Sequence, residues 1–191
     1  GVPLEKVTME TEISGLNIVP ATIDLSSADI DLISNEKRSH LLHEALRKKQ
    51  QDKQKYDYIL IDCPPSLNIL TVNAMVASHS VLIPLQSEFF ALEGLTQLLL
   101  TVKEVRQTAN ENLRVEGIVL TMFDGRNNLS KQVEADARSN LRELVFKTII
   151  PRNVRVSEAP SYSMPVLTYD PSSKGSKAYM SLAKELLANN S

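Results

Sequence analysis

The chain has one cysteine and no long apolar run, and each shortage excludes a class of protein. A single thiol, Cys63, rules out an internal disulfide and fits a reducing compartment. No apolar stretch approaches the length of a membrane-spanning helix and no signal-peptide pattern opens the chain, so we expect a cytoplasmic protein. His40 and His43 have no cysteine or third histidine near them in the sequence, which argues against a metal site built on them.

Charge is nearly balanced overall, with a formal net charge of −2, but it is unevenly distributed. Acidic side chains outnumber basic ones over residues 1–121, whereas basic side chains outnumber acidic ones over residues 122–178. A nucleic acid would therefore be expected on the second part of the chain, if anywhere. Scattered, solvated charges explain the same composition equally well.

Short apolar runs alternate with segments of helical periodicity along the whole chain. Strands are predicted at residues 16–20, 56–62, 80–85, 115–122 and 145–150, and helices at 26–46, 67–76, 92–109, 129–144 and 176–187. A long loop is predicted at 152–173. Helical spacing predicts one apolar face of the first helix that includes Ile30 and Ile33, and one of the last helix with Tyr179, Leu182, Ala183, Leu186 and Leu187. Ser66 is the predicted cap of the helix at 67–76. This alternation predicts an α/β fold with a mostly parallel, twisted sheet flanked by helices. The length suits a single domain over residues 1–191.

The segment from Tyr56 to Asp62 is a short apolar run that ends in a carboxylate, and we interpret it as a buried strand. Ligands of parallel sheets bind beyond the carboxyl ends of the strands, where Asp62 would lie. An acidic residue at that position resembles the Walker B motif of P-loop ATPases, which helps to hold Mg²⁺. An aspartate after a strand also serves as a turn former or a helix cap, so the motif alone does not decide.

Four ordered motifs together resemble the ParA/Soj family of chromosome- and plasmid-partitioning ATPases. They are Asp-Cys-Pro-Pro-Ser at 62–66, Glu-Phe-Phe-Ala-Leu-Glu-Gly at 88–94, Thr-Met-Phe-Asp-Gly-Arg at 121–126 and Ile-Pro-Arg-Asn-Val-Arg-Val-Ser-Glu-Ala-Pro-Ser at 150–161. The resemblance implies an ATPase that holds ATP and Mg²⁺ between the subunits of a homodimer. It implies binding to nonspecific DNA, a ParB-type partner, and a nucleoid-associated location in a bacterial cytoplasm, with no membrane attachment.

The chain departs from this family in two respects, because it lacks the segment that would carry switch I and the Gly-rich Walker A loop with its lysine. Such a loop cradles phosphate with backbone N–H groups at a helix N-terminus. The six glycines here are scattered and no segment has the required spacing. We therefore expect a truncated chain that lacks the P-loop strand and helix, does not hydrolyse ATP unaided, and exposes strand edges that a missing central strand would cover.

The resemblance also implies roles for individual residues. Asp62 would orient the Mg²⁺ shell, and Pro64 and Pro65 would shape the switch II segment. The nucleotide-binding positions would be Thr121, Met122, Pro151, Arg152, Asn153 and Glu88, although ordinary loop packing, or a solvated carboxylate for Glu88, remains an alternative. The DNA-binding positions would be Arg126, Arg155 and Lys174, with Lys177, Lys131 and Arg138 as weaker candidates; a solvated lysine is the simpler interpretation of any single one.

Three other functions share parts of this pattern. A MinD-like, membrane-associated regulator of cell division would need a richer basic face than the last helix offers with Lys177 and Lys184. A non-catalytic module would keep its DNA or partner contacts without turnover. An electron carrier of the nitrogenase-reductase type would need bridging cluster cysteines, for which the lone Cys63 is badly placed.

Overall fold

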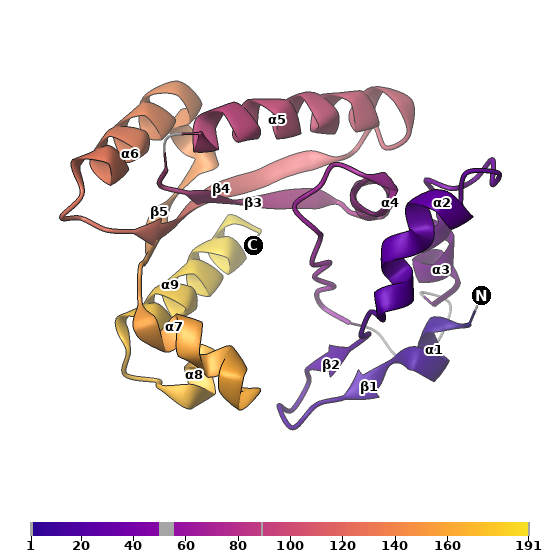
Figure 1. The fold of residues 1–191 in the computed structure, drawn as a ribbon, viewed down its shortest axis with the longest axis horizontal. Helices are drawn as coiled ribbons and strands as arrows, with labels where there is room; N and C mark the ends of the chain where they lie inside the picture. Colours follow the sequence, from indigo (N-terminus) through magenta and orange to yellow (C-terminus); the bar gives the residue numbers. More distant parts are fainter. Residues whose placement is uncertain (1, 50–55, 89, 191) are drawn as a thin grey trace. The chain divides into compact units, whose positions relative to one another are not determined.

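The computed structural model describes residues 2–49, 56–88 and 90–190 (Figure 1). The chain divides into two compact units, each taken by itself below. Unit 1 comprises Gly1–His79 and Thr101–Leu113, and unit 2 comprises Ser80–Leu100 and Arg114–Ser191. Both units are therefore discontinuous in the sequence.

Unit 2 is built on a three-stranded parallel sheet of order β3-β4-β5. The strands are β3 (Ser80–Gln86), β4 (Arg114–Phe123) and β5 (Val145–Pro151). Helix α5 (Ala91–Thr108) follows β3, and helix α6 (Asn128–Leu141) with the 3-10 turn η2 (Arg142–Leu144) follows β4. The predicted α/β class with a parallel sheet flanked by helices is confirmed.

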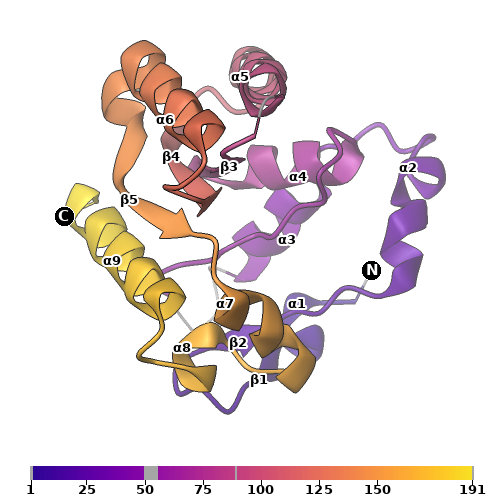
Figure 2. The ribbon, with the colours of Figure 1, turned by 60° about the vertical axis from the view of Figure 1, so that its left-hand side comes forward.

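Both faces of this sheet are covered, as Figures 1 and 2 show. On one face, Ile83, Leu85, Ile118 and Leu120 pack with apolar side chains of α5 and α6, including Leu95 and Ala137. On the other face, Val119, Phe146 and Ile150 pack with Leu182, Ala178 and Leu186 of helix α9 (Lys174–Asn189). The alternation of Ile118, Val119 and Leu120 between the two clusters is the period-2 pattern of a strand buried on both faces.

Strand β4 carries a bulge near its start that depends on Gly117. Val81 pairs with Val115, but Leu82 pairs with Gly117, so Glu116 is an extra residue in the ladder. Gly117 has φ +156, and a Cβ atom at this position would overlap the ring of Phe146 and lie 3.1 Å from the Leu144 carbonyl oxygen. A side chain is therefore excluded at this position by both conformation and space.

The segment between β5 and α9 is helical in places, not the open loop predicted for 152–173. It contains α7 (Val154–Glu158), the 3-10 turn η3 (Ala159–Tyr162) and α8 (Val166–Tyr169). Helix α9 was predicted to bury a face including Tyr179, Ala183 and Leu187, and this was wrong because all three are exposed. Spacing alone gives a helix's apolar stripe but not which edge of it meets the sheet.

Unit 1 begins with α1 (Leu4–Val7) and an antiparallel hairpin of β1 (Met9–Glu10) and β2 (Asn17–Ile18). One continuous helix predicted from Ser26 to Leu46 is wrong. The structure has the 3-10 turn η1 (Ile23–Ser27), then α2 (Ala28–Asp31), then α3 (Leu41–Lys49). Ile30 and Ile33, expected on the buried face, are 73% and 65% exposed.

Two asparagines hold helix α4 (Ile69–Ala77) in unit 1. Buried Asn73 donates through Nδ2 to the carbonyls of Arg38 (2.6 Å) and Ile69 (2.9 Å) and accepts from Leu42 N–H (3.3 Å). Asn110 donates through Nδ2 to the carbonyls of Met75 (3.0 Å), Val76 (3.4 Å) and Ser78 (2.8 Å) at the helix end. The Asn110 bonds satisfy carbonyls that the C-terminus of a helix otherwise leaves open, and the Asn73 bonds tie α4 to residues 38 and 42.

The predicted buried strand from Tyr56 to Asp62 does not form. The segment is irregular, and Tyr58, Ile59 and Leu60 are 53%, 51% and 85% exposed. A strand exists only beside a partner, and in the described part of the chain no segment pairs with residues 56–62. Strand β3 lies at one end of the strand order β3-β4-β5, so among the described residues it pairs on one side only.

Among the described residues, no helix has both the length and the apolarity needed to cross a membrane.

Candidate functional site

In unit 2, the carboxyl ends of β4 and β5 bring together two segments that the sequence had singled out. Phe123 pairs with Pro151, and the Arg152 N–H donates to the Phe123 carbonyl oxygen at 2.9 Å. Thr121 and Met122 therefore lie on the strand beside the one that leads into Pro151, Arg152 and Asn153. Parallel sheets bind their ligands beyond the carboxyl ends of their strands, as at this position.

The backbone at the end of β4 is strained. Met122 has φ +52, a left-handed conformation that is rare for a residue with a side chain and costs about 1–2 kcal/mol. Thr121 still pairs with Gln86 of β3, whereas Phe123 pairs with β5. Met122 therefore lies between the last residue of β4 that pairs with β3 and the last that pairs with β5, and it is 42% exposed. Strained residues of this type cluster at functional sites.

A polar link not predicted from the sequence joins three elements at this edge. Buried Ser87 donates from Oγ to the Thr121 carbonyl at 3.4 Å, and Ser130 of α6 donates from Oγ to the Ser87 carbonyl at 3.4 Å. Glu88 follows directly in a turn, where its N–H donates to the Gln86 carbonyl at 2.9 Å, and the residue is exposed. The link fixes the β3 end, and with it the start of the Glu88 turn, against the β4 end.

Asp124 and Arg126 form a closed pair in the turn after β4. Arg126 donates through Nε to Oδ1 (3.0 Å) and through NH2 to Oδ2 (2.8 Å), and its N–H donates to Oδ1 (3.0 Å). These bonds lower the pKa of Asp124 to about 2, and the charge of Arg152 adds to the effect. The Arg126 side chain is 91% exposed, so it lies at the surface with its charge already matched.

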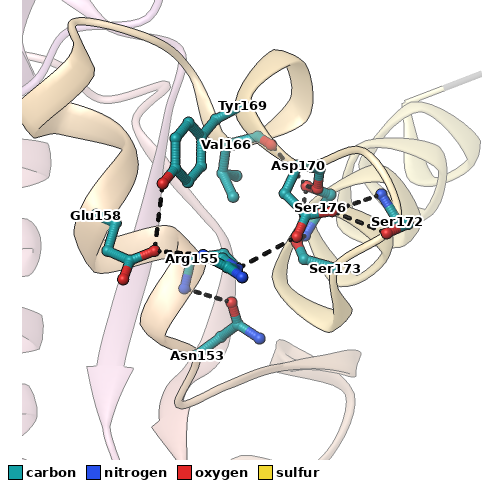
Figure 3. A network of polar contacts seen from close by, with 9 residues as sticks. All are labelled: Asn153, Arg155, Glu158, Val166, Tyr169, Asp170, Ser172, Ser173 and Ser176. Atoms are coloured by element: carbon teal, nitrogen blue, oxygen red, sulfur yellow. Dashed lines mark hydrogen bonds and ion pairs between the residues drawn. The ribbon is translucent and has the colours of Figure 1, made fainter.

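Arg155 lies on the short helix α7, within a second network shown in Figure 3. Its NH1 donates to Glu158 Oε2 at 2.9 Å, and its Nε lies 3.4 Å from Asp170 Oδ2. Asn153 caps α7 by accepting from the Arg155 N–H at 3.0 Å. The same asparagine that ends the β5 segment thus begins the helix that carries this arginine.

Lys174 is the first residue of α9 and lies beside α7. Ser173 caps α9 by accepting the Ser176 N–H at 3.1 Å. A Cβ atom on buried Gly175 would overlap Val156 and lie 3.4 Å from Asn153 Oδ1, so the two helix starts are in close contact. Arg155 and Lys174, predicted as DNA-binding residues, are therefore neighbours, each one residue from this contact.

Asp62, Pro64 and Pro65 belong to unit 1, where all three are exposed in an irregular segment. Partial burial of the Cys63 thiol raises its pKa, and the adjacent Asp62 carboxylate raises it further. No group of three or more potential metal ligands occurs within the described ranges. A single exposed carboxylate fits Mg²⁺, because this ion keeps several waters and takes its other ligands from substrate phosphates.

The acidic partners of the two predicted arginines were not identified from the sequence. Arg126 and Arg155 were predicted as functional residues, but no role was predicted for the carboxylates that compensate their charges, Asp124, Glu158 and Asp170. The i, i+3 spacing of Arg155 and Glu158 was an available signal on a helix. The Asp124-Gly125-Arg126 sequence was an available signal for a turn in which the aspartate bonds the backbone two residues on. Asp170 lies too far along the chain to be paired by spacing.

Comparison with known proteins gives consistent matches over most of the chain. A family model described as an AAA domain matches residues 2–115. The chromosome partitioning protein ParA of Caulobacter vibrioides is 50% identical over 186 residues, which cover 97% of this chain and 69% of that protein. The sporulation initiation inhibitor protein Soj of Bacillus subtilis is 51% identical over 179 residues, covering 94% and 70%.

A similar fold is found in a solved structure. It is the cobyrinic acid a,c-diamide synthase of Mycobacterium smegmatis with bound ADP and magnesium. The TM-score is 0.79 at 34% identity, with 97% of this chain and 67% of that chain covered.

Proposed function

The chain belongs to the ParA/Soj family of chromosome-partitioning ATPases, and on that premise we propose that it binds ATP with Mg²⁺ as part of DNA segregation. Members of this family are P-loop ATPases. We further propose that the chain forms an ATP-dependent homodimer and that this dimer binds nonspecific DNA. A ParB-type partner would stimulate hydrolysis and so release the DNA.

The contact between the β4 and β5 ends carries the nucleotide part of the proposal. The Arg152 N–H donates to the Phe123 carbonyl oxygen, and this bond holds the end of β4 beside the end of β5. The segment at 121–122 therefore lies next to the segment at 151–153. Two strand ends held in this way offer backbone donors and acceptors that suit the edge of an adenine ring. The strained Met122 and the exposed Glu88 turn would complete the nucleotide-binding set.

Asp62 would act on the Mg²⁺ ion, through a water ligand, and Pro64 and Pro65 would stiffen the following switch segment. Mg²⁺ supplies electrostatic stabilisation of the transferred phosphoryl group. The sequence contains no Gly-rich loop with a lysine to hold the phosphates. We therefore propose that this 191-residue chain does not turn over ATP unaided.

The exposed positions of Arg126, Arg155 and Lys174 support the DNA part of the proposal. Arginine binds phosphate through a planar fork, and such contacts do not read sequence. Replacement of Arg155 by Ala is expected to weaken binding to duplex DNA and to reduce the slope of log affinity against log salt by about 0.9. The matched control is Arg47→Ala, which removes an exposed arginine of α3 in unit 1.

A titration of the ¹⁵N-labelled chain with MgATP tests the nucleotide part. We expect the backbone amides of residues 121–123, 152 and 153 to shift on nucleotide binding, and we expect Mg²⁺-dependent shifts at residues 62, 63 and 66 that Asp62→Asn abolishes. Asp57→Asn removes an exposed carboxylate from the same segment and should leave them unchanged. Shifts confined to other residues, or equal effects of the two substitutions, would refute the assignment.

The membrane-associated alternative predicts that α9 offers an apolar face for lipid. Instead, Ala178, Leu182 and Leu186 pack against β4 and β5. Co-sedimentation with anionic liposomes at low salt would be needed to revive this alternative.

A further inference from the structure

Arg155 is enclosed by acidic and phenolic groups, in what we call the Arg155 cluster: Arg155, Glu158, Tyr169 and Asp170 (Figure 3). Glu158 Oε2 accepts from Arg155 NH1 at 2.9 Å and from the Tyr169 hydroxyl at 3.3 Å. Asp170 Oδ2 lies 3.4 Å from Arg155 Nε. One cation therefore faces two carboxylates, and its charge is more than compensated.

The two carboxylates are held differently. Asp170 belongs to a turn that fixes it independently of the arginine, because its Oδ1 accepts from Ser172 N–H (3.1 Å) and Oγ (2.8 Å), and its carbonyl accepts from Ser176 Oγ (2.6 Å). Glu158 bonds only Arg155 and Tyr169 among the described residues, and its side chain is 39% exposed. Glu158 is therefore the partner that can be exchanged.

The remaining donors of Arg155 permit such an exchange. A guanidinium has five N–H groups, and the two contacts use one on Nε and one on NH1. Neither ion pair uses NH2, and the Arg155 side chain is 52% exposed, so an incoming anion can reach the guanidinium. A DNA phosphate that reached this edge would still meet the negative charge of Glu158, because the carboxylate is bonded to the same guanidinium.

We propose that Glu158 is an internal competitor of DNA phosphate for Arg155, so that DNA binds when the Glu158 carboxylate leaves the arginine. This rests on the proposed binding of DNA by Arg155. Phosphate and carboxylate present the same oxygen geometry to an arginine fork, so one can replace the other. Asp170 keeps Arg155 in position during the exchange, whereas Tyr169 helps to hold Glu158 on the arginine until DNA displaces it.

The test is the affinity of the full 191-residue chain for a short fluorescein-labelled DNA duplex, measured by anisotropy over a series of salt concentrations. Glu158→Gln keeps the size of the side chain and removes the competing charge. We expect affinity to rise about threefold to fivefold at low salt, in the range of one exposed ion pair. The slope of log affinity against log salt should change by less than about 0.9, because Arg155 makes the same phosphate contact in both chains once Glu158 has left it.

Two further variants separate the competitor from a general charge effect. Glu44→Gln removes a carboxylate that pairs with Lys37 at 3.3 Å in unit 1, and it should leave the salt slope unchanged. Tyr169→Phe alters no charge but removes the hydrogen bond from the Tyr169 hydroxyl to Glu158, so that Glu158 is held less firmly beside Arg155. It is expected to change affinity by less than about twofold, in the direction of tighter binding.

An affinity for Glu158→Gln that is unchanged, lowered, or raised no more than by Glu44→Gln overturns the proposal. Arg155→Ala decides whether the DNA site itself is at fault. If Arg155→Ala weakens binding while Glu158→Gln does not strengthen it, DNA binding stands and the competitor fails. If Arg155→Ala has no effect, both fail.

Discussion

Replacement of Gly117 by alanine tests whether the packing of unit 2 depends on the bulge in β4. The new Cβ would overlap Phe146, at 2.8 Å from Cδ2 and closer still to Cε2, and would lie 3.1 Å from the Leu144 carbonyl. Phe146 is 4% exposed and belongs to the cluster under α9, so its ring has little room to move. The conformation with φ +156 adds strain for any side chain.

The expected loss in the free energy of unfolding combines overpacking, backbone strain and the entropy of the unfolded chain. Overpacking of a core costs about 1–3 kcal/mol, and a Gly-only conformation costs about 1–3 kcal/mol. The alanine reduces the freedom of the unfolded chain, which returns about 0.4–1 kcal/mol. We therefore expect Gly117→Ala to lower the free energy of unfolding by about 2–4 kcal/mol.

Urea unfolding followed by far-ultraviolet circular dichroism measures this loss, since the chain has no tryptophan to report by fluorescence. Gly94→Ala is the matched control, because its Cβ meets nothing within 4 Å and the residue lies in α5, where alanine is favoured by up to about 1 kcal/mol. A loss below about 0.5 kcal/mol for Gly117→Ala would refute the reasoning. If the ring overlap is the cause, Phe146→Leu in the same chain should recover part of the loss, a coupling of about 1 kcal/mol.

Three further predictions concern single polar groups. Asn73→Ala leaves two carbonyls without their side-chain donor and should cost about 1–3 kcal/mol in urea unfolding, whereas a neutral effect would contradict the buried network. Because the pKa of Asp124 lies near 2, below its ordinary value of 3.8, its pair with Arg126 stabilises the fold above about pH 4 and loses this effect as pH falls through about 2. Arg126→Ala should return the pKa of Asp124 toward 3.8 in a carboxyl NMR titration, and an unmoved pKa would refute the pairing. Glu185 accepts from two β5 N–H groups at 2.7 and 2.9 Å, so Glu185→Ala should speed hydrogen exchange of those two amides but not of the others in β5.

The elements of unit 2 were predictable because each carries its own signal. β3, β4, β5, α5, α6 and α9 all form within a few residues of the predicted bounds. Their apolar residues have partners on both faces of the sheet, so local periodicity and burial agree. The turns around Asn153 and Ser173 were missed as helix starts, although both are standard capping residues.

Unit 1 was predicted less well because its signals depend on partners elsewhere in the chain. The run from Tyr56 to Asp62 has the composition of a buried strand, but composition does not supply the neighbour whose hydrogen bonds make a strand. Ser66 was predicted to cap α4, yet Asn68 does so, accepting from Leu70 and Thr71 N–H groups. The site was predicted in the same uneven way. The strand ends at Thr121 and Pro151 meet as expected, but Asp170, the second carboxylate beside Arg155, could not be placed from spacing.

The three hydrogen bonds from Asn110 to the end of α4 also have a consequence for the order of synthesis. They span 32 to 35 residues of sequence, and the whole of β3 is translated between their two ends. A nascent chain that has reached His79 has made α4 but still lacks the amide that closes its last carbonyls. Unit 1 is therefore complete only after the first strand of the other unit has been made, because residues 101–113 belong to unit 1 and follow β3 in the chain.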